Sequence, residues 1–366
     1  MQPLLPDVLQ VTTLVRELLA GPRESGTPDA DRARERIAEF LSGLGYQVEI
    51  QRFSFSTSAL LAFPVLGAGL GWLTLLQIPL LVLPGAPAWA AFLVWITGML
   101  SLGTVALGLS LGWATLGGVR EDANLIATRG GKVTRWIVAH YDTKAQGHSM
   151  AGRLTAVWVL VVACLVMTGL AVARLWGPVP TAAMAAGAGL AIVAGYLAGR
   201  GRLKGKSAGA RDNGSGLLAA MIAAQEIRDP TVGILVTGAE EFGLIGSRYF
   251  AEKSGEQVTG TDVLNVDTVD HQGKWRLVSH LPGTDDLLDR AESALRALSS
   301  FPIRRHRHLS GIFVDSLPLA RAGARAITIA RLDWGTLGRI HTSRDTLEEL
   351  SLESAVMAGA AIARMI

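Results

Sequence analysis

The stretch Trp-Ile-Val-Ala-His-Tyr-Asp, residues 136–142, places a histidine and an aspartate directly after four apolar residues. The apolar run predicts a buried β-strand that ends at His140. Ligands of open α/β sheets bind beyond the carboxyl ends of the strands, so this position suits a metal ligand. Asp142 can accept a hydrogen bond from the second ring nitrogen of His140, which would fix the tautomer that binds metal. Alone, such a His-x-Asp pair is only a weak metal signal.

Three further segments place acidic residues at strand ends or before a helix. Asp212 opens Asp-Asn-Gly-Ser-Gly ahead of a helical pattern at 217–227. Glu240-Glu241 follows the apolar strand pattern 232–237, and Asp267 follows the pattern 263–266. Each has an ordinary alternative, such as a helix cap or a solvated strand end.

A fifth segment, His341-Thr342, lies in the loop before the last predicted helix. A lone histidine is more often a structural group than a ligand. The joint set has the residue types that two close zinc ions require: two imidazoles, three carboxylates of which one can be shared, and one free carboxylate as a base. No other interpretation accounts for all five segments.

The segments resemble the di-zinc exopeptidase family that includes aminopeptidase Y, secreted bacterial aminopeptidases and glutamate carboxypeptidase. The matching marks are His-x-Asp, Asp-Asn-x-Ser-Gly, Glu-Glu, the aspartate of Asn-Val-Asp and a final His-Thr-x-x-Asp-Thr at 341–346. Phe-Val-Asp at 313–315, followed by Gly-Ala-Arg-Ala at 323–326, resembles the family's Ser-Asp-His…Gly-Ile-Pro-Ala segment. The resemblance covers the polar part of the chain.

The resemblance implies a role for each matching residue. His140 and Asp267 would hold one Zn²⁺, Glu241 and His341 the other, and Asp212 would bridge them. Glu240 would be the general base that deprotonates the attacking water, and Asp142 joins it in the catalytic group as the residue that orients His140. Co²⁺ or Mn²⁺ could substitute for zinc at such a site. Two departures, Ile340 in place of an aromatic residue and Ser316 in place of a histidine, leave specificity and oxyanion stabilisation open.

The chain is unusually apolar, since it is 49% hydrophobic and only 18% charged over 366 residues. Soluble domains average about 25% charged residues. Four runs lack any Asp, Glu, Lys or Arg: Ala59–Leu83, Ala88–Gly117, Leu154–Ala173 and Thr181–Gly199. Each reaches the roughly 20 residues that cross a bilayer, although buried core helices are the alternative. Short Pro-Gly turns join the runs in pairs, which predicts two transmembrane hairpins.

Both hairpins would leave from and return to one side of the membrane. Basic residues lie near the spans on that side, including Arg120, Lys144 and the run 200–206, so the positive-inside rule places the polar domain in the cytoplasm. Residues 1–20 lack the basic and apolar regions of a signal peptide. The single Cys164 excludes a disulfide framework. A net charge of +3 does not suggest nucleic acid as a partner.

Without the hairpins (58–117 and 153–199), residues 1–57, 118–152 and 200–366 form one predicted α/β domain, a mixed β-sheet flanked by helices. Strands are expected at 46–55, 124–128, 134–140, 232–237, 263–266, 276–279 and 326–330, and helices at 7–19, 29–44, 217–227, 243–253, 287–298 and 347–366. Gly130-Gly131 predicts a tight antiparallel turn between the strands 124–128 and 134–140. That pairing would set the start of the first strand beside His140.

The sequence therefore predicts a membrane-anchored di-zinc metallopeptidase, an aminopeptidase in particular, that acts on peptide substrates. Since one hairpin precedes 124–128 and the other runs from just after His140 to just before Asp212, we hypothesise that the site looks toward the bilayer and that its substrates are membrane-associated or apolar peptides. A plain anchor with an ordinary peptide substrate is the alternative. A single-zinc glutaminyl cyclase and a non-catalytic membrane receptor or scaffold remain competing functions.

Overall fold

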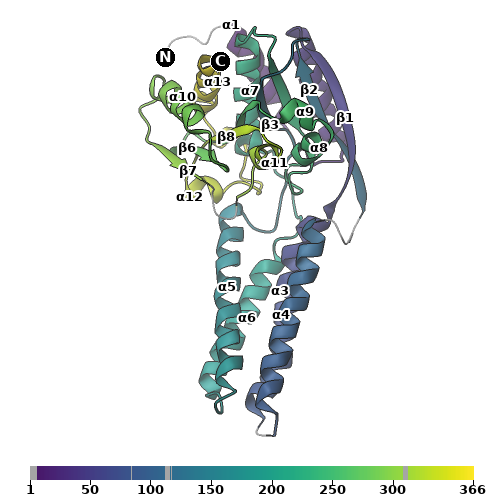
Figure 1. Ribbon diagram of the computed structural model, residues 1–366, viewed down its shortest axis with the longest axis vertical. Coiled ribbons are helices and arrows are strands. Elements are labelled where there is room, and N and C mark those ends of the chain that lie inside the picture. Colours follow the sequence, from purple (N-terminus) through teal and green to yellow (C-terminus); the bar gives the residue numbers. More distant parts are fainter. Residues whose placement is uncertain (1–5, 84, 112–115, 117, 308–311) are drawn as a thin grey trace. The chain divides into compact units, whose positions relative to one another are not determined.

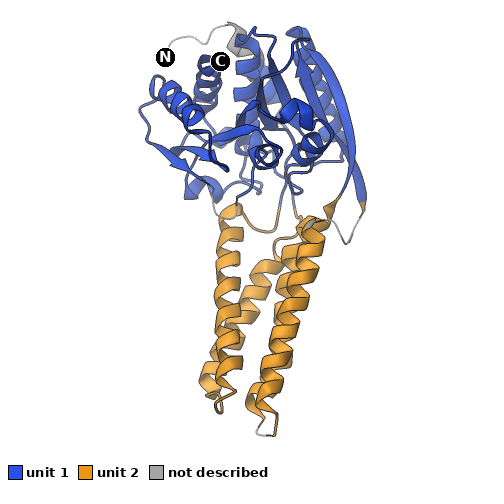
Figure 2. Ribbon diagram, viewed as in Figure 1, with its two compact units in different colours: residues 1–55, 119–145, 205–366 blue, residues 56–118, 146–204 orange. Residues whose placement is uncertain are grey.

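The computed structural model describes residues 6–83, 85–111, 116, 118–307 and 312–366 (Figure 1). It divides into two compact units (Figure 2). Unit 1 comprises Met1–Phe55, Val119–Ala145 and Gly205–Ile366, and unit 2 comprises Ser56–Gly118 and Gln146–Lys204.

Unit 1 contains an eight-stranded sheet in the order β1-β2-β4-β3-β5-β8-β6-β7. Strand β3 pairs in parallel with β4 and β5, and β5 with β8, whereas β2/β4 and β6/β8 are antiparallel. The predicted mixed sheet flanked by helices is thus confirmed. The strands are β1 (Gln47–Ser56), β2 (Val119–Thr128), β3 (Arg135–His140), β4 (Val232–Thr237), β5 (Asp262–Val269), β6 (Lys274–Ser279), β7 (Ile303–His306) and β8 (Arg325–Leu332).

Helices cover both faces of this sheet, and side chains of β3 alternate between the two resulting cores. Ile137 and Ala139 belong to one core, and Trp136 and Val138 to the other. A strand that is apolar on both faces is expected where helices cover a parallel sheet on both sides. The first core is closed by α1 (Pro6–Leu18), α2 (Pro28–Gly43), α7 (Ser215–Glu226), α10 (Asp285–Arg296) and α13 (Glu353–Met365), the second by α8 (Ile245–Lys253), α9 (Gly255–Val258) and α11 (Ser316–Arg321).

The predicted antiparallel hairpin between β2 and β3 is wrong, because β4 lies between them. The connection from β2 crosses the start of β4: Thr134 N donates to Thr231 O at 2.8 Å, and a Cβ on Gly131 would lie 2.6 Å from Pro230 O. The six residues of β4 are all buried, so this strand needs a partner on each side. The start of β2 still lies at the His140 edge of the sheet, since β2 runs antiparallel and β3 parallel to β4.

Several elements differ from the predicted ones. Strand β7 and the short helices α11 and α12 (Trp334–Leu337) were not predicted. The single helix expected at 347–366 is a 3₁₀ turn, Leu347–Glu349, followed by α13. Contacts from other segments hold the intervening backbone extended: Arg211 donates to Glu349 O, and Ser351 N donates to His271 Nδ1.

Unit 2 consists mainly of four helices, α3 (Ala62–Val82), α4 (Ala88–Leu111), α5 (Met150–Ala173) and α6 (Thr181–Gly199). Within the described part of the chain, four helical segments are apolar enough by length and composition to cross a membrane: Thr57–Val82, Ala88–Ser110, Met150–Ala173 and Thr181–Gly199. Gly67 of α3 and Gly195 of α6 let the helix backbones meet, because a Cβ on Gly195 would lie 2.5 Å from Gly67 O. Large apolar side chains such as Trp72 and Leu165 are 71% and 67% exposed.

Candidate metal centre

The carboxyl ends of β3, β4 and β5 meet at one edge of the sheet, and each delivers acidic or imidazole groups there. His140 is the last residue of β3 and lies opposite Thr237, the last residue of β4. Glu240 and Glu241 follow β4 by three and four residues, and Asp267 lies near the end of β5. Two loops complete the edge with Asp212 and His341. All six side chains are buried, with 1–8% exposure.

Two groups of three residues could each hold a metal ion, and Asp212 belongs to both. In the first, His140 Nε2 lies 3.1 Å from Asp212 Oδ1 and 3.7 Å from Asp267 Oδ1. In the second, His341 Nε2 lies 3.2 Å from Asp212 Oδ2 and 3.1 Å from Glu241 Oε2. The two oxygens of Asp212 therefore face different groups, which is the arrangement that a bridging carboxylate requires.

The donor set fits metal ions better than it fits a purely protein-bonded cluster. Glu241 Oε1 is buried and has no hydrogen-bond partner among the described residues, and the buried His140 Nε2 faces carboxylate oxygens of Asp212 and Asp267. Burying such groups without partners is costly, and imidazole and carboxylate donors are those that zinc prefers. Burial alone would raise the pKa of Asp212, but contact with His140 and His341 lowers that pKa. The Asp212 carboxylate is therefore held in its charged form, which is the form that can bind a metal ion.

Glu240 lies beside both groups without belonging to either. Its Oε2 is 3.9 Å from His140 Nε2. Burial, together with the neighbouring carboxylates of Glu241, Asp315 and Asp267, raises the pKa of Glu240 well above its usual range. A carboxyl with a raised pKa next to a metal centre can accept and return a proton.

Comparison with known proteins identifies the family. Residues 124–366 match the peptidase family M28. The chain belongs to this family. No curated protein matches the chain. The match and the donor set support a zinc peptidase.

Solved structures of this fold include enzymes of two activities. A glutaminyl cyclase from Fimbriiglobus ruber superposes with a TM-score of 0.59 at 18% identity, covering 100% of this chain and 96% of that one. An aminopeptidase from Aneurinibacillus sp. strain AM-1 gives 0.55 at 15% identity, covering 97% and 93%. A Zn-dependent exopeptidase from Parabacteroides distasonis gives 0.58 at 15% identity, covering 97% and 96%. At these low sequence identities, the structural similarity shows a common fold and does not show a common activity.

The turn that carries Asp212 is held in place by the side chain of the next residue, Asn213. Asn213 Oδ1 accepts from the amides of Gly216 and Thr268, and its Nδ2 donates to Val266 O. These bonds tie the Asp212 turn to β5 beside Asp267. A Cβ on Gly216 would lie 2.1 Å from Asn213 Oδ1 and 2.5 Å from Val266 O, so only glycine fits there.

Asp142 contacts His140 and also supports the two glutamates. His140 Nδ1 lies 3.2 Å from the backbone oxygen of Asp142 and 3.6 Å from its Oδ1. The two carboxylate oxygens accept from the amides of Glu240 and Glu241 at 3.1 and 3.2 Å. The hydrogen-bond partner of His140 Nδ1 is thus the backbone oxygen of Asp142, whereas its carboxylate orients the loop that carries Glu240.

Strained backbone conformations occur close to the candidate metal donors. Three of the four described non-glycine residues with positive φ are Ala239, just before Glu240, Thr268, just after Asp267, and His341 itself, at 51°, 56° and 64°. Such conformations cost about 1–3 kcal/mol each and persist where the surrounding structure enforces them. The strained backbone thus lies at or directly beside the side chains of the two candidate donor groups and Glu240.

Some residues at the site were missed from the sequence or had no assigned role. Lys144 Nζ lies 2.8 Å from Glu241 Oε2, and Asp345 accepts from the amides of Arg211 and Asp212 at 2.7 and 3.2 Å. Burial raises the pKa of Asp345 to about 6. Asp345 stands in the His-Thr-x-x-Asp-Thr motif, which could have flagged it. Lys144, four residues after His140, offered no comparable signal.

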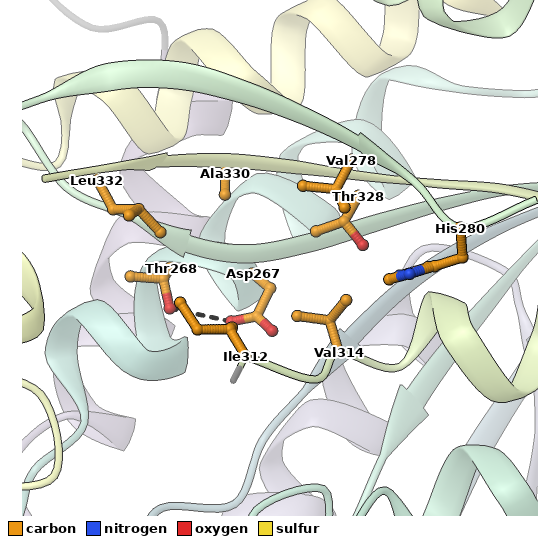
Figure 3. Close-up of a pocket in the computed structure, with 9 residues that line it drawn as sticks. All are labelled: Asp267, Thr268, Val278, His280, Ile312, Val314, Thr328, Ala330 and Leu332. Atoms are coloured by element: carbon orange, nitrogen blue, oxygen red, sulfur yellow. Dashed lines mark hydrogen bonds between the residues drawn. The ribbon is translucent and has the colours of Figure 1, made fainter. Parts of the chain in front are cut away.

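A pocket opens beside Asp267 (Figure 3). It has a volume of about 350 Å³, counted to its open mouth. Most of its wall is aliphatic, and His280 and Thr328 supply polar groups at one end. The lining residues are Asp267, Thr268, Val278, His280, Ile312, Val314, Thr328, Ala330 and Leu332. Ser316, one of the two departures from the family resemblance in the sequence, is fully buried, and its Oγ lies 3.1 Å from His280 Nε2 and 2.6 Å from Thr328 Oγ1.

Proposed function

We propose that the chain is a membrane-anchored di-zinc peptidase that removes residues from the amino terminus of peptides. The observation that carries the proposal is the pair of donor groups that share Asp212, with Glu240 beside them. His140, Asp212 and Asp267 would hold one Zn²⁺, and Asp212, Glu241 and His341 the other.

Zinc ions bound there would polarise the peptide carbonyl and lower the pKa of a water toward about 7. Glu240 takes the proton from the attacking water and returns it to the leaving amine. Asp142 holds the Glu240 amide, and thereby keeps the base in reach of the water. The burial of Glu240 among carboxylates favours its protonated form once it has taken the proton from water. A protonated Glu240 can then donate that proton to the leaving amine.

The pocket beside Asp267 supports an apolar residue at the cleaved end of the substrate. Val278, Val314 and Leu332 give it an aliphatic wall within reach of the first metal group. Burial of one aliphatic side chain contributes about 1.5–3 kcal/mol to binding. Apolar amino-terminal residues should therefore be preferred over charged ones.

Four apolar helical segments support the membrane anchor. The basic residues near the spans favour a cytoplasmic catalytic domain by the positive-inside rule. Lys144 contacts ligand Glu241, and Ala145, the next residue, is the last of its segment in unit 1. Because this connection leaves unit 1 beside the metal groups, we extend the proposal to membrane-associated or apolar peptides as substrates.

A glutaminyl cyclase is the second candidate, because solved cyclases share this fold with TM-scores up to 0.59. A cyclase would close an amino-terminal glutamine onto itself and release ammonia. It would need one zinc rather than two. A non-catalytic receptor or scaffold would turn over neither kind of substrate.

The test uses the full chain purified in detergent. Its substrates are leucine and glutamine aminoacyl amides, and the same leucine amide with an acetylated amino group. Hydrolysis of the free leucine amide, two bound zinc ions and a 10²–10⁴-fold loss in Glu240→Gln are expected. Glu252→Gln, an exposed carboxylate on α8, is the matched control and should retain full activity.

Other outcomes separate the alternatives. Cyclisation of the glutamine substrate with one bound zinc would establish the cyclase. Absence of any turnover with intact zinc binding would favour the scaffold. Equal hydrolysis by wild type and Glu240→Gln would refute the proposed mechanism.

A further inference from the structure

Arg23 lies behind the metal centre and binds two chain segments that are far apart in sequence. Its Nε donates to Tyr141 O at 2.8 Å, and its Nη1 donates to Ala208 O at 2.7 Å. Nη2 donates to Gly209 O at 3.2 Å, and Nη1 also reaches Leu18 O at 3.0 Å. The guanidinium therefore spans the segment just after His140 and the segment just before Asp212.

The backbone of Arg23 adds two further bonds to the first of these segments. Arg23 N donates to Thr143 Oγ1 at 2.8 Å, and Thr143 N donates to Arg23 O at 3.1 Å. Two residues on, Ser25 Oγ accepts from the amide of Ala239, directly before Glu240, at 2.9 Å. The short loop from Arg23 to Ser25 thus contacts three of the segments that carry site residues.

The charge of Arg23 belongs with the site as well. The residue is 1% exposed, and among the described residues its guanidinium donates to backbone oxygens, which carry no charge. A buried cation without a contacting carboxylate is costly. The nearby carboxylates of Asp345, Asp142 and Asp212 offset that cost through space.

The two segments that Arg23 joins, after His140 and before Asp212, are separated by a long stretch of the chain. Residues Gln146–Lys204 of unit 2 lie between Thr143 and Ala208. Closing a long loop carries an entropic cost, and the geometry of its ends must come from contacts rather than from the loop itself. His140 and Asp212 flank this interval, and their donor atoms must stay about 3 Å apart for the first metal group.

We propose that Arg23 is a positioning residue for the metal centre, which fastens the segments after His140 and before Asp212 so that their donor atoms meet. This inference rests on the proposed metal sites. A guanidinium suits the task because its five donors lie in a rigid fork, whereas a lysine ammonium is a point charge on a flexible stem. Arg23→Lys keeps the charge and removes the fork, so it isolates geometry from electrostatics.

The measurement is the zinc dissociation constant of the full chain in detergent, obtained by competition with a chelator of known affinity. Outer contacts that orient metal ligands are typically worth 10–100-fold in affinity, so Arg23→Lys should bind zinc about 10–100-fold more weakly. The leucine amide assay should show a lower kcat with little change in KM. Arg331→Lys is the matched control, because Arg331 is 2% exposed and donates to Gly273 O and Ser354 Oγ outside the metal groups.

A merely structural arginine gives a different result. Arg23→Lys and Arg331→Lys would then both lower the melting temperature, and both would bind zinc like wild type, which overturns the inference. If Arg23→Lys does not fold, Thr143→Val decides instead, since it removes only the acceptor of Arg23 N. The zinc affinity of Thr143→Val should fall at least about threefold, which is less than the 10–100-fold range because only one contact is lost. An unchanged zinc affinity overturns the inference. Wild type without zinc binding would instead refute the proposed function.

Discussion

Both units bury polar side chains, but under different conditions. In unit 1 the sheet edge gathers six ionisable side chains, and the partners of several are other charges. In unit 2 the buried polar groups of the helices make neutral bonds: Thr74 to Leu70 O, Gln77 to Ala91 O, and Trp95 Nε1 to Thr168 Oγ1. Charge is concentrated where counter-charges and a metal can meet it, whereas these three polar groups of unit 2 donate to neutral oxygens of its own helices.

The same contrast appears at the surface of each unit. Unit 2 exposes Trp72, Trp158 and Leu165 at 65–71%, which is unusual in water and ordinary in lipid. The helices of unit 1 instead expose charged residues that form ion pairs, such as Arg296 with Glu292. A substitution that introduces a charge at an exposed apolar side chain should therefore be costly in unit 2 and nearly neutral in unit 1.

The largest effect is expected at Asp212. Asp212→Asn weakens both donor groups, whereas Asp267→Asn weakens one. Loss of metal stabilisation of the transition state removes several kcal/mol, or about 10³-fold or more in activity. Zinc counted by mass spectrometry should fall from two to one in Asp267→Asn and further in Asp212→Asn. Equal zinc contents in the two variants would contradict a shared carboxylate.

The next effect compares two exposed leucines. Leu165 in α5 is 67% exposed and Leu281 in unit 1 is 41% exposed. Arginine at the centre of a membrane span costs about 2.5–3.5 kcal/mol by insertion scales. Arginine at a water-exposed site costs within about 0.5 kcal/mol. Leu165→Arg should reduce the membrane-inserted fraction, while Leu281→Arg should not. Similar fractions for both variants would argue against a membrane span at α5.

A smaller effect is expected where helices of unit 2 touch. Gly195→Val forces a side chain against the Gly67 backbone, whereas nothing lies within 4 Å of the Cβ position at Gly189 in the same helix. Overpacking costs about 1–3 kcal/mol. The melting temperature in detergent should fall for Gly195→Val and stay near wild type for Gly189→Val. Identical melting of the two variants would show that the α3/α6 contact is not needed.

The smallest effect concerns specificity. Val314→Ala enlarges the pocket beside Asp267 by two methyl groups without touching a metal donor. A methylene in an apolar pocket is worth about 1–3 kcal/mol, so kcat/KM for small apolar residues should fall about tenfold or more relative to larger ones. Val356→Ala on α13 is the control. An unchanged preference would exclude this pocket from substrate binding.

Strong local patterns were predicted well from the sequence. Strand β4 has the predicted bounds, and α7 and α8 lie within two residues of the predicted ones. The five segments of candidate ligands come together because each follows a strand or precedes a helix at one sheet edge. The functional roles of these residues stay predictions.

Long-range order was harder to predict. Gly130-Gly131 is typical of a hairpin turn between β2 and β3. In the structure β4 lies between these two strands, because a fully buried strand needs a partner on each side. Arg23 could not be assigned because its partners are backbone oxygens, which any residue type supplies. The short strand β7 has polar residues at three of its four positions, Arg304, Arg305 and His306, and carries no apolar pattern.

The insertion of β4 between β2 and β3 also sets an order of events during synthesis. When the ribosome has made His140, β2 and β3 both exist, but the strand that joins them ends only at Thr237. At 5–20 residues per second, the intervening 97 residues take about 5–20 s. Within that interval α5 and α6 are produced, while β2 and β3 still lack the strand that pairs with both. The nascent chain therefore completes its apolar helices before its catalytic sheet can close, and a chaperone that shields the strand edges that pair with β4 would raise the yield of folded protein.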